Sequence, residues 1–358
     1  MDKCDIIIPV WNQKEVTKEC VDSILKHTDY PYRLILIDNG SEKDTEDYLA
    51  SLKDVKGLDL LLIRNNKNLG FVKAVNQGMV ASESPYLCIM NNDTIATEGW
   101  LNEMMDVMAI YPEIGLLNPS SNTSGQYPPE NRSIDDYALI LRGFKRQIQE
   151  LYTCRGFCMI LRRSVMDDLG VLDEAYHLGY FDDTDYCKRA QAKGYRTARA
   201  KASYVYHKEN TTFKKLDNNS DLFKANEKIF FTRWGRSVRV AYFVDRPDRT
   251  GKIDALATDL ARSGHQVMVF IKQGIDWPVR LDHFDIRRFD VNQYLFGALS
   301  IYKTLKRKKK KKLDILVTDN KALGAVLKAM KNLHGSDVFI DPDRDTLFEA
   351  IKEKSKDF

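Results

Sequence analysis

The first hundred residues alternate between continuous apolar runs and segments in which apolar side chains recur every three or four positions. The runs at 4–10, 33–38, 58–64 and 86–90 are largely apolar, as in strands buried on both faces of a sheet. Helical spacing follows at 16–25, 44–52, 71–82 and 100–111. Strands that alternate with helices across short connections predict a largely parallel sheet with crossover helices.

After Asn118 the alternation becomes less regular. Residues 121–133 are rich in turn formers, and we expect a loop there. The next patterns predict strands at 156–163 and near 203–207, and helices at 164–170, 183–194 and 221–234.

A second strand and helix alternation begins at Val238. It predicts strands at 238–245, 265–271, 313–319 and 337–341, with helices at 253–264, 294–305, 321–331 and the C-terminal end. This is a Rossmann-like unit of about 120 residues, a usual domain size. We therefore expect an α/β protein with two domains, 1–235 (halves 1–118 and 119–235) and 236–358.

The composition is that of an ordinary globular protein. Apolar residues make up 43% and charged residues 30%, and the formal net charge of +4 is too mild to indicate a nucleic-acid partner. No apolar run approaches the 18 or so residues of a membrane helix. Six scattered cysteines without zinc spacing predict reduced core thiols in a cytoplasmic protein.

One run of charge stands out, KRKKKKK at 306–312. Such a run is typical of a solvated helix end or loop. It is also suited to peripheral contact with anionic lipid at the inner face of a membrane.

Four polar clusters follow the first four predicted strands. They are PVWNQ (9–13), DNGS (38–41), NNKNLGF (65–71) and NNDT (91–94). Each alone is compatible with a turn, since Asn and Asp bond their own backbone. Four at the same edge of a parallel sheet predict a ligand crevice, because open α/β sheets bind ligands at the carboxyl ends of their strands.

In this order and spacing, the four clusters resemble the nucleotide-binding half of family-2 glycosyltransferases, which have the GT-A fold. GFCMILRRSVMDDLGVLDEAYHLGYFDDTDYCKRAQAKGY (156–195) resembles the acceptor half, and the likeness spans residues 4 to about 213. It is nearest to rhamnosyl- and galactofuranosyl-type members. The resemblance implies an inverting transfer from a UDP-, dTDP- or GDP-sugar to a glycan or lipid-linked acceptor in bacterial surface polysaccharide synthesis.

The resemblance also implies roles for the donor side. Asp38 would accept from the nucleobase, with Pro9 and Asn12 lining the base and ribose pocket. The remaining positions would lie beside the ribose and diphosphate: Asn68, Gly70, Lys73 and Asn92. For Lys73 the alternative is a solvated helix lysine.

A metal site is implied by two further residues. Asp93 occupies the position of the last acid of the family's DxD motif, and a hard Mg²⁺ or Mn²⁺ ion suits its oxygen. Asn91 stands where that motif has its first acid. His207 matches a histidine that completes the metal site in related enzymes, although a histidine after a strand is otherwise an ordinary hydrogen-bonded polar residue.

The acceptor side needs a base for the incoming hydroxyl. FDDTDY (181–186) supplies three acids, which would also suit the start of a helix. By resemblance Asp183 is the base. Asp185 and Arg189, four residues apart on one predicted helix, are expected to form an ion pair.

The second domain opens with VRVAYFVDRPDRTGKIDALATDLARSGHQVMVF (238–270), which resembles the start of one half of a GT-B glycosyltransferase. One half alone is not expected to be catalytic. Two other functions remain open for the whole chain. One is a non-catalytic nucleotide-sugar-binding or scaffold protein, and the other is a sugar nucleotidyltransferase, which would need a Gly-rich loop where this chain has PVWNQKE.

Overall fold

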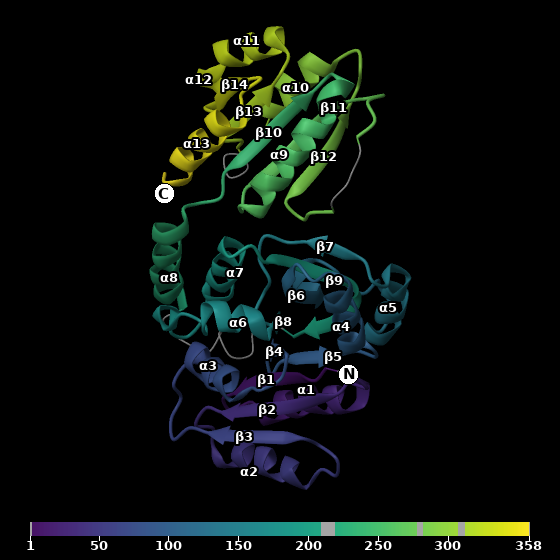
Figure 1. The fold of residues 1–358 in the computed structure, drawn as a ribbon, viewed down its shortest axis with the longest axis vertical. Helices are drawn as coiled ribbons and strands as arrows, with labels where there is room; N and C mark the ends of the chain where they lie inside the picture. Colours follow the sequence, from purple (N-terminus) through teal and green to yellow (C-terminus); the bar gives the residue numbers. More distant parts are fainter. Residues whose placement is uncertain (1, 209–218, 278–281, 307–311, 358) are drawn as a thin grey trace. The chain divides into compact units, whose positions relative to one another are not determined.

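The computed structural model describes residues 2–208, 219–277, 282–306 and 312–357 (Figure 1). The chain divides into two compact units. The first comprises Met1–Gln149 and Thr153–Lys228, and the second comprises Glu150–Tyr152 and Ile229–Phe358. The division falls within helix α8 (Asn219–Trp234), whereas the predicted boundary lies after residue 235. Each unit is described by itself below.

The first unit is built on a mixed sheet in the order β3-β2-β1-β4-β8-β6-β9-β5, with β7 (Ile148–Glu150) on β9. Four strands run parallel: β3 (Leu60–Arg64), β2 (Tyr32–Asp38), β1 (Cys4–Val10) and β4 (Tyr86–Met90). Strand β8 (Cys158–Arg162) is antiparallel to both β4 and β6 (Ile114–Ser120), and β6 is parallel to β9 (Arg196–His207). β1 is buried along its whole length, as its apolar run predicts.

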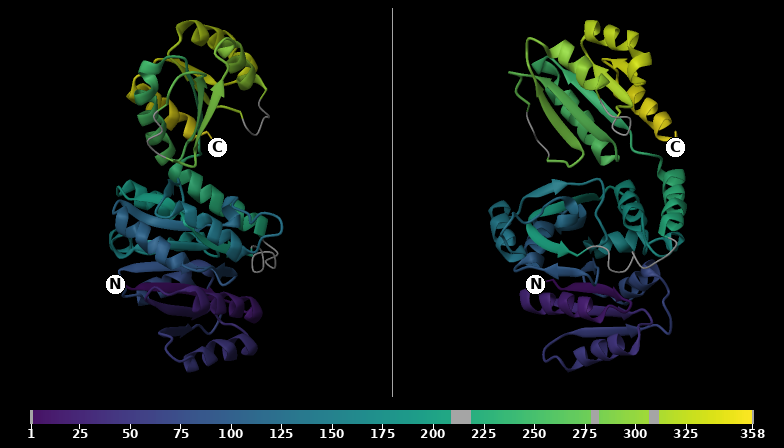
Figure 2. Two further views of the ribbon diagram at one scale, coloured as in Figure 1. Left: turned by 90° about the vertical axis from the view of Figure 1, so that its right-hand side faces the viewer. Right: turned by 180° about the vertical axis from the view of Figure 1, so that it is seen from behind.

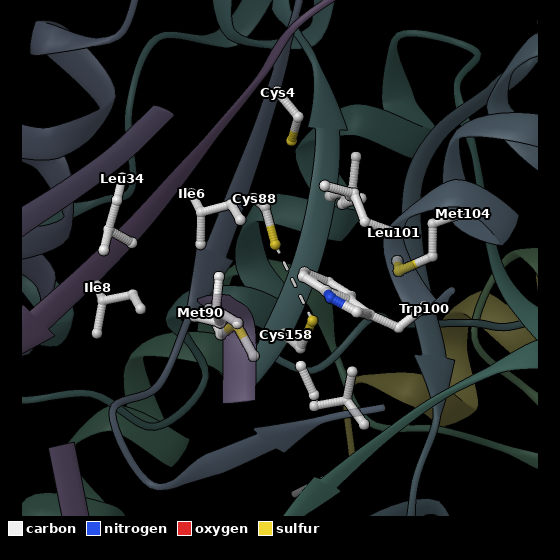
Figure 3. Close-up of a cluster of buried hydrophobic side chains, with 14 of the residues drawn as sticks. Cys4, Ile6, Ile8, Leu34, Cys88, Met90, Trp100, Leu101, Met104 and Cys158 are labelled. Atoms are coloured by element: carbon white, nitrogen blue, oxygen red, sulfur yellow. Dashed lines mark hydrogen bonds between the residues drawn. The ribbon is translucent and has the colours of Figure 1, made fainter. Parts of the chain in front are cut away.

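Helices cover this sheet. They are α1 (Lys14–His27), α2 (Lys43–Ser51), α3 (Phe71–Ala81), α4 (Trp100–Ile110), α5 (Ile134–Leu141), α6 (Arg163–Leu169) and α7 (Asp182–Ala192), followed by α8. In the core, the indole of Trp100 lies beside the sulfurs of Cys88 and Cys158, whose Sγ atoms are 4.0 Å apart (Figure 3). All six cysteines are buried and unpaired, so the predicted core thiols are confirmed. Burial raises the pKa of the Cys20 thiol to about 12.

The irregular middle of the unit contains elements that the sequence pattern did not predict. Strand β5 (Thr94–Ala96) has only three residues, and it begins inside the NNDT cluster. Strand β6 contains Asn118 and Pro119 yet is buried throughout, and α5 begins at a capping box of Ser133 and Asp136. A strand that is short, or that contains buried polar residues, lacks the apolar pattern from which strands are predicted.

The second unit contains a parallel five-stranded sheet in the order β12-β11-β10-β13-β14. Its strands are β10 (Arg239–Val244), β11 (Gln266–Lys272), β12 (Ile286–Val291), β13 (Ile315–Thr318) and β14 (Asp337–Ile340). Helices α9 (Thr250–Arg262) and α13 (Arg344–Ser355) pack on one face (Figures 1 and 2). Helices α10 (Phe296–Leu305) and α11 (Lys321–Ala329) pack on the other, beside α12 (Lys331–His334). The predicted α/β architecture is confirmed for both units.

Strand β12 was not predicted. It carries Arg287, Arg288 and Asp290 on an edge of the sheet, and these exposed charges mask its alternation. Within the described part of the chain, no helix is long and apolar enough to cross a membrane.

Candidate active site

The end of β2 is fixed by Asp38. Its carboxylate is almost fully buried, accepts a hydrogen bond from the Ser41 backbone N–H at 2.9 Å, and pairs with the Arg64 guanidinium at the end of β3. Arg64 is also 3.2 Å from Glu46. The predicted nucleobase contact therefore lies in a charged network that joins two strand ends. Sequence reasoning missed Arg64 because cross-strand partners depend on sheet register.

The end of β1 turns through Asn12 and Gln13, which both have positive φ angles, 56° and 62°. Asn12 stabilises this turn because its Oδ1 accepts from the Glu42 N–H at 2.7 Å, while its own N–H donates to Ser41 Oγ at 2.8 Å. Pro9 is buried in β1 opposite Ile37. The first two polar clusters are thus hydrogen-bonded directly to each other.

Asn39 connects the third cluster to the second. Its side chain donates to Asn68 Oδ1 at 2.8 Å and accepts from Asn65 Nδ2 and the Leu69 N–H, both at 3.0 Å. It also reaches the Gly70 carbonyl at 3.2 Å, and Gly70 has φ 90°. Asn39 was not singled out in the sequence, although DNGS contains it.

Gly40 lets these loops approach closely. A Cβ at this position would lie 2.6 Å from backbone atoms of Lys67, and φ is 77°. Only glycine fits this combination of conformation and contact.

Lys73 lies on α3, one turn after Gly70. Its Nζ is 3.8 Å from a carboxylate oxygen of Glu174, and both side chains are about half exposed. An ion pair this exposed contributes little to stability.

The fourth cluster brings Asp93 and His207 together. Strand β5 pairs antiparallel with β9 so that Thr94 lies opposite His207. As a result, His207 Nε2 lies 3.0 Å from Asp93 Oδ1 and 3.4 Å from Asn91 Nδ2. The Asn92 amide instead donates to Thr17 Oγ1 on α1 at 2.8 Å. The two predicted metal ligands are therefore in contact, and Asn92 is directed to another partner.

The chemistry of this group fits a divalent cation. Among the described residues, Asn91 Oδ1 and His207 Nδ1 are buried and have no hydrogen-bond partner. Rotating the Asn91 amide by 180° would turn its oxygen toward His207 Nε2. Among the described residues, no group of three or more His, Cys, Asp or Glu side chains is placed to hold a metal ion. The Asn91 amide oxygen is a candidate further ligand beside Asp93 and His207. Asp93, His207 and Asn91 offer the oxygen and imidazole ligands that Mn²⁺ accepts.

The predicted base lies at the start of α7. Asp183 Oδ2 accepts from the Gly156 N–H at 2.8 Å, and Oδ1 accepts from the Thr184 N–H at 2.6 Å. These bonds fix the carboxylate but leave lone pairs for another donor. Asp185 is buried and pairs with Arg189 at 2.9 Å, which confirms the predicted ion pair.

Asp182 is the more deeply buried neighbour. Burial, and then the charge of Asp183, raise the pKa of Asp182 to about 8. The carboxyl group of Asp182 is therefore mainly protonated near neutral pH.

The turn before α7 has a strained backbone. Tyr180 and Phe181 both have φ 68°, unusual for aromatic residues. The turn is held by the buried Asn226 of α8, which donates to the carbonyls of Tyr176 at 2.9 Å and Gly179 at 2.7 Å. Such strain persists only where the surroundings impose it, and it is common at functional sites.

A cavity of about 640 Å³ connects these groups. This is the size range of small-molecule sites. Its lining includes Asp182, Asp183, Asn91, His207 and the exposed Arg155, which donates to the Thr123 carbonyl at 2.5 Å. Asp93 contacts His207 but does not itself line the cavity. Arg155 was not anticipated, since a single arginine in a loop carries no signal. The donor-side candidates do not line this cavity: Pro9, Asn12, Asp38, Asn68, Gly70, Lys73 and Asn92.

Comparison with known proteins gives a family match. Residues 5–170 match the model described as Glycosyl transferase family 2. An uncharacterized protein of Sinorhizobium fredii, y4gI, is 26% identical over 231 residues, covering 58% of this chain and 24% of that protein. An uncharacterized glycosyltransferase of Haemophilus influenzae is 28% identical over 141 residues, covering 36% and 43%. The chain thus spans less than half the length of either relative.

Among solved structures, a mannosyltransferase from Pyrobaculum calidifontis, in complex with GDP-Man and Mn²⁺, is similar to this chain. The TM-score is 0.47 at 17% sequence identity, covering 59% of this chain and 58% of that one.

Proposed function

We propose, from the match of residues 5–170 to the model described as Glycosyl transferase family 2, that this chain moves a hexosyl or deoxyhexosyl group from a nucleotide-sugar donor to a hydroxyl acceptor with inversion. The observation that carries this proposal is the cavity of about 640 Å³. It is lined both by a fixed carboxylate, Asp183, and by His207 beside Asp93.

In the proposed reaction, Asp183 accepts the proton of the acceptor hydroxyl as its oxygen bonds to the anomeric carbon. The bond from that carbon to the diphosphate oxygen breaks at the same time, and the nucleoside diphosphate leaves. Proton removal by a positioned carboxylate contributes about 10²–10⁴-fold to such rates. The hydrogen bonds from Gly156 and Thr184 orient the carboxylate for this role.

Asp182 supports this assignment electrostatically. Because its pKa is raised to about 8, Asp182 is mainly protonated near neutral pH and adds no second negative charge beside Asp183. Two ionised carboxylates side by side would repel each other.

Asp93, His207 and the oxygen of Asn91 would hold a divalent cation, Mg²⁺ or Mn²⁺. When bound, it would neutralise charge developing on the leaving diphosphate. Arg155 offers additional fixed positive charge at the same cavity. On the donor side, we assign the nucleobase to Asp38, the base and ribose pocket to Pro9 and Asn12, and the ribose and diphosphate to the remaining candidates: Asn68, Gly70, Lys73 and Asn92.

We propose a glycan or lipid-linked acceptor and a role in bacterial surface polysaccharide synthesis on the cytoplasmic side of the membrane. The basic run proposed to approach that membrane lies mostly outside the described residues, at 307–311. Supporting the biosynthetic role, 173 residues are 22% identical to a poly-beta-1,6-N-acetyl-D-glucosamine synthase of Staphylococcus epidermidis, covering 41% of that protein.

The test is a panel of UDP-, dTDP- and GDP-sugars with Mg²⁺ or Mn²⁺, followed by thermal stabilisation and by donor turnover. A donor present at 100 times its Kd should stabilise the native state by about 2.7 kcal/mol. Turnover should cease with chelator and return with the metal. Donor binding without turnover on any acceptor would favour a binding or scaffold protein. Formation of a nucleotide sugar from a nucleoside triphosphate and a sugar phosphate would indicate a nucleotidyltransferase.

A further inference from the structure

Helix α8 contributes to the candidate active site although it lies outside the family match. The matched residues end at 170, whereas Phe223 of α8 lines the cavity of about 640 Å³. The residues of α8 up to Lys228 belong to the first unit, as do the other residues of that cavity. Phe223 is 40% exposed, so part of its ring is left uncovered by the protein. An uncovered aromatic ring in a cavity is suited to contact with a ligand.

Phe223 is one of three clustered rings, which we call the aromatic wall: Tyr180, Phe181 and Phe223. The ring centroid of Phe223 lies 5.5 Å from that of Tyr180 and 5.3 Å from that of Phe181, with interplanar angles of 80° and 51°. All three residues line the cavity, and Tyr180 and Phe181 are half-buried. Asp183 follows Phe181 by two residues and lines the same cavity. The aromatic wall therefore presents an apolar surface close to the candidate base.

Helix α8 also fixes the backbone that carries the other two rings. Tyr180 and Phe181 both have φ 68°, a conformation that costs energy for aromatic residues. Asn226 is 1% exposed, follows Phe223 by three residues, and donates to the Gly179 carbonyl at 2.7 Å. Residues three apart lie on the same face of a helix. One face of α8 thus supplies both a ring of the aromatic wall and the amide that holds the turn.

Hydroxyl groups line the same cavity as these rings. Thr184 Oγ1 lies 3.1 Å from Asp183 Oδ1, and Thr153 Oγ1 lies 3.5 Å from Thr184 Oγ1. The cavity thus combines aromatic rings with hydroxyl and carboxylate groups. A sugar ring matches both kinds of group. Its polarised C–H groups are attracted to the negative faces of aromatic rings, while its hydroxyls form hydrogen bonds.

Two other ligands match this combination less well. A polyprenyl chain would contact the rings but would bring no hydrogen-bonding group to Asp183 or to the threonine hydroxyls. A nucleobase also stacks on aromatic rings, but the candidates for the base pocket of the donor do not line this cavity: Pro9, Asn12 and Asp38. The aromatic wall is therefore assigned to the acceptor.

We propose that α8 completes an acceptor subsite, in which the aromatic wall stacks against a sugar ring and directs one hydroxyl of that ring toward Asp183. The acceptor is thus the ring of a glycan rather than the phosphate of a lipid. The proton of this hydroxyl passes to Asp183 as its oxygen bonds to the anomeric carbon and the nucleoside diphosphate leaves. This inference rests on the proposed glycosyl transfer, which leaves the class of acceptor open.

The test measures acceptor use by the full chain. The acceptors are methyl glycosides of hexoses, N-acetylhexosamines and 6-deoxyhexoses, together with polyprenyl phosphate, and the donor is one that the wild type turns over. For the best glycoside, Phe223→Ser should raise KM about tenfold, because a stacked ring is lost. The donor Kd should change less than about twofold, since the donor candidates lie elsewhere. Phe223→Tyr keeps a ring and should restore KM to within about threefold of the wild-type value.

A second measurement does not require turnover. Saturation-transfer NMR of the same glycosides, without donor, should show contact between the wild type and the ring C–H protons of the sugar. The signals should weaken in Phe223→Ser. The matched control for both measurements is Phe144→Ser, which removes a phenylalanine that is 45% exposed and does not line this cavity. It should keep the wild-type KM and the wild-type signals.

Three results would overturn the inference while the proposed glycosyl transfer stands. They are an unchanged glycoside KM in Phe223→Ser, a raised KM that Phe223→Tyr does not restore, and transfer to polyprenyl phosphate with no glycoside bound or used. If the wild type turns over no donor, the proposed function fails instead. The NMR signals then decide whether the aromatic wall binds a sugar ring.

Discussion

The carboxyl ends of the parallel strands are built differently in the two units. In the first unit the end of β4 at Asn91 adjoins a cavity of about 640 Å³, which is also lined by Asp183 and His207. In the second unit the ends of β10 and β13 are crossed by polar contacts. Arg246 and Arg249 lie 3.3 and 3.6 Å from Asp319, and Asn320 donates to Asp245 at 2.6 Å. The cavity beside Asp319 measures about 30 Å³.

Strand ends at the carboxyl edge of the sheet therefore adjoin a large cavity in the first unit and a small one in the second. A volume of about 30 Å³ accommodates a water molecule or two, whereas ligand sites usually need ~300 Å³ or more. The point where strand order reverses can bind a ligand only if the side chains at the strand ends leave room for it. In the second unit, ion pairs occupy that room.

The largest change should come from removing the metal candidates of the first unit. Asp93→Asn combined with His207→Gln leaves neither the carboxylate nor the imidazole for a cation. We expect transfer to fall about 10³-fold, the scale on which loss of charge stabilisation slows reactions of this kind. Steady-state kinetics would measure this loss, and Mn²⁺ binding followed by electron paramagnetic resonance should weaken in parallel.

The matched control combines Asp135→Asn with His27→Gln, which changes the same residue types outside the cavity. It should keep both properties of the wild type. Full activity of the Asp93 and His207 variant in the presence of chelator would rule out the metal assignment.

Asp182 should make stability depend on pH. Its folded pKa of about 8 lies above the value near 4 of an unfolded aspartate, so folding favours its protonated form. The resulting stabilisation is complete below pH ~4 and disappears as pH rises toward ~8. Relative to Asp182→Asn, the wild type should lose several kcal/mol of unfolding free energy across this interval, at roughly 1.4 kcal/mol per unit of pKa difference. Urea denaturation at pH 5 and pH 9 would show it, and parallel stability curves would contradict it.

The smallest effect is expected in the second unit. Arg249→Met removes contacts with Asp319 and Asp341 but leaves Arg246 on Asp319. We expect a loss of about 1 kcal/mol in unfolding free energy and no change in kcat. Denaturation combined with kinetics would test both. A large fall in kcat would mean that the closed strand ends of this unit take part in the reaction.

Sequence patterns predicted most strands and helices of both units, because continuous apolar runs and three-to-four spacing are strong signals. The Asp185–Arg189 pair was also predictable, since four residues on a helix place two side chains together. The family resemblance identified Asp93 and His207 as candidates, but the sequence did not show why the two side chains lie together. It is the pairing of β9 with β5, a strand of only three residues.

Other features depended on tertiary structure alone. Arg64 reaches Asp38 only through the register of β2 and β3, and Asn39 joins three loops only after they fold. The spacing in 294–305 predicted a helix but not which face would be buried. That face was set by packing of Phe296 against the sheet, and it left Tyr302 and Leu305 outside.

The most direct test of the central claim is single-turnover transfer by Asp183→Asn with donor and metal saturating. Donor affinity should stay close to the wild-type value, because Asp183 is assigned to the acceptor proton rather than to the donor. The rate of the chemical step should fall about 10³-fold. Wild-type transfer by Asp183→Asn would contradict the account, and Asp183 could not then be the base in this cavity.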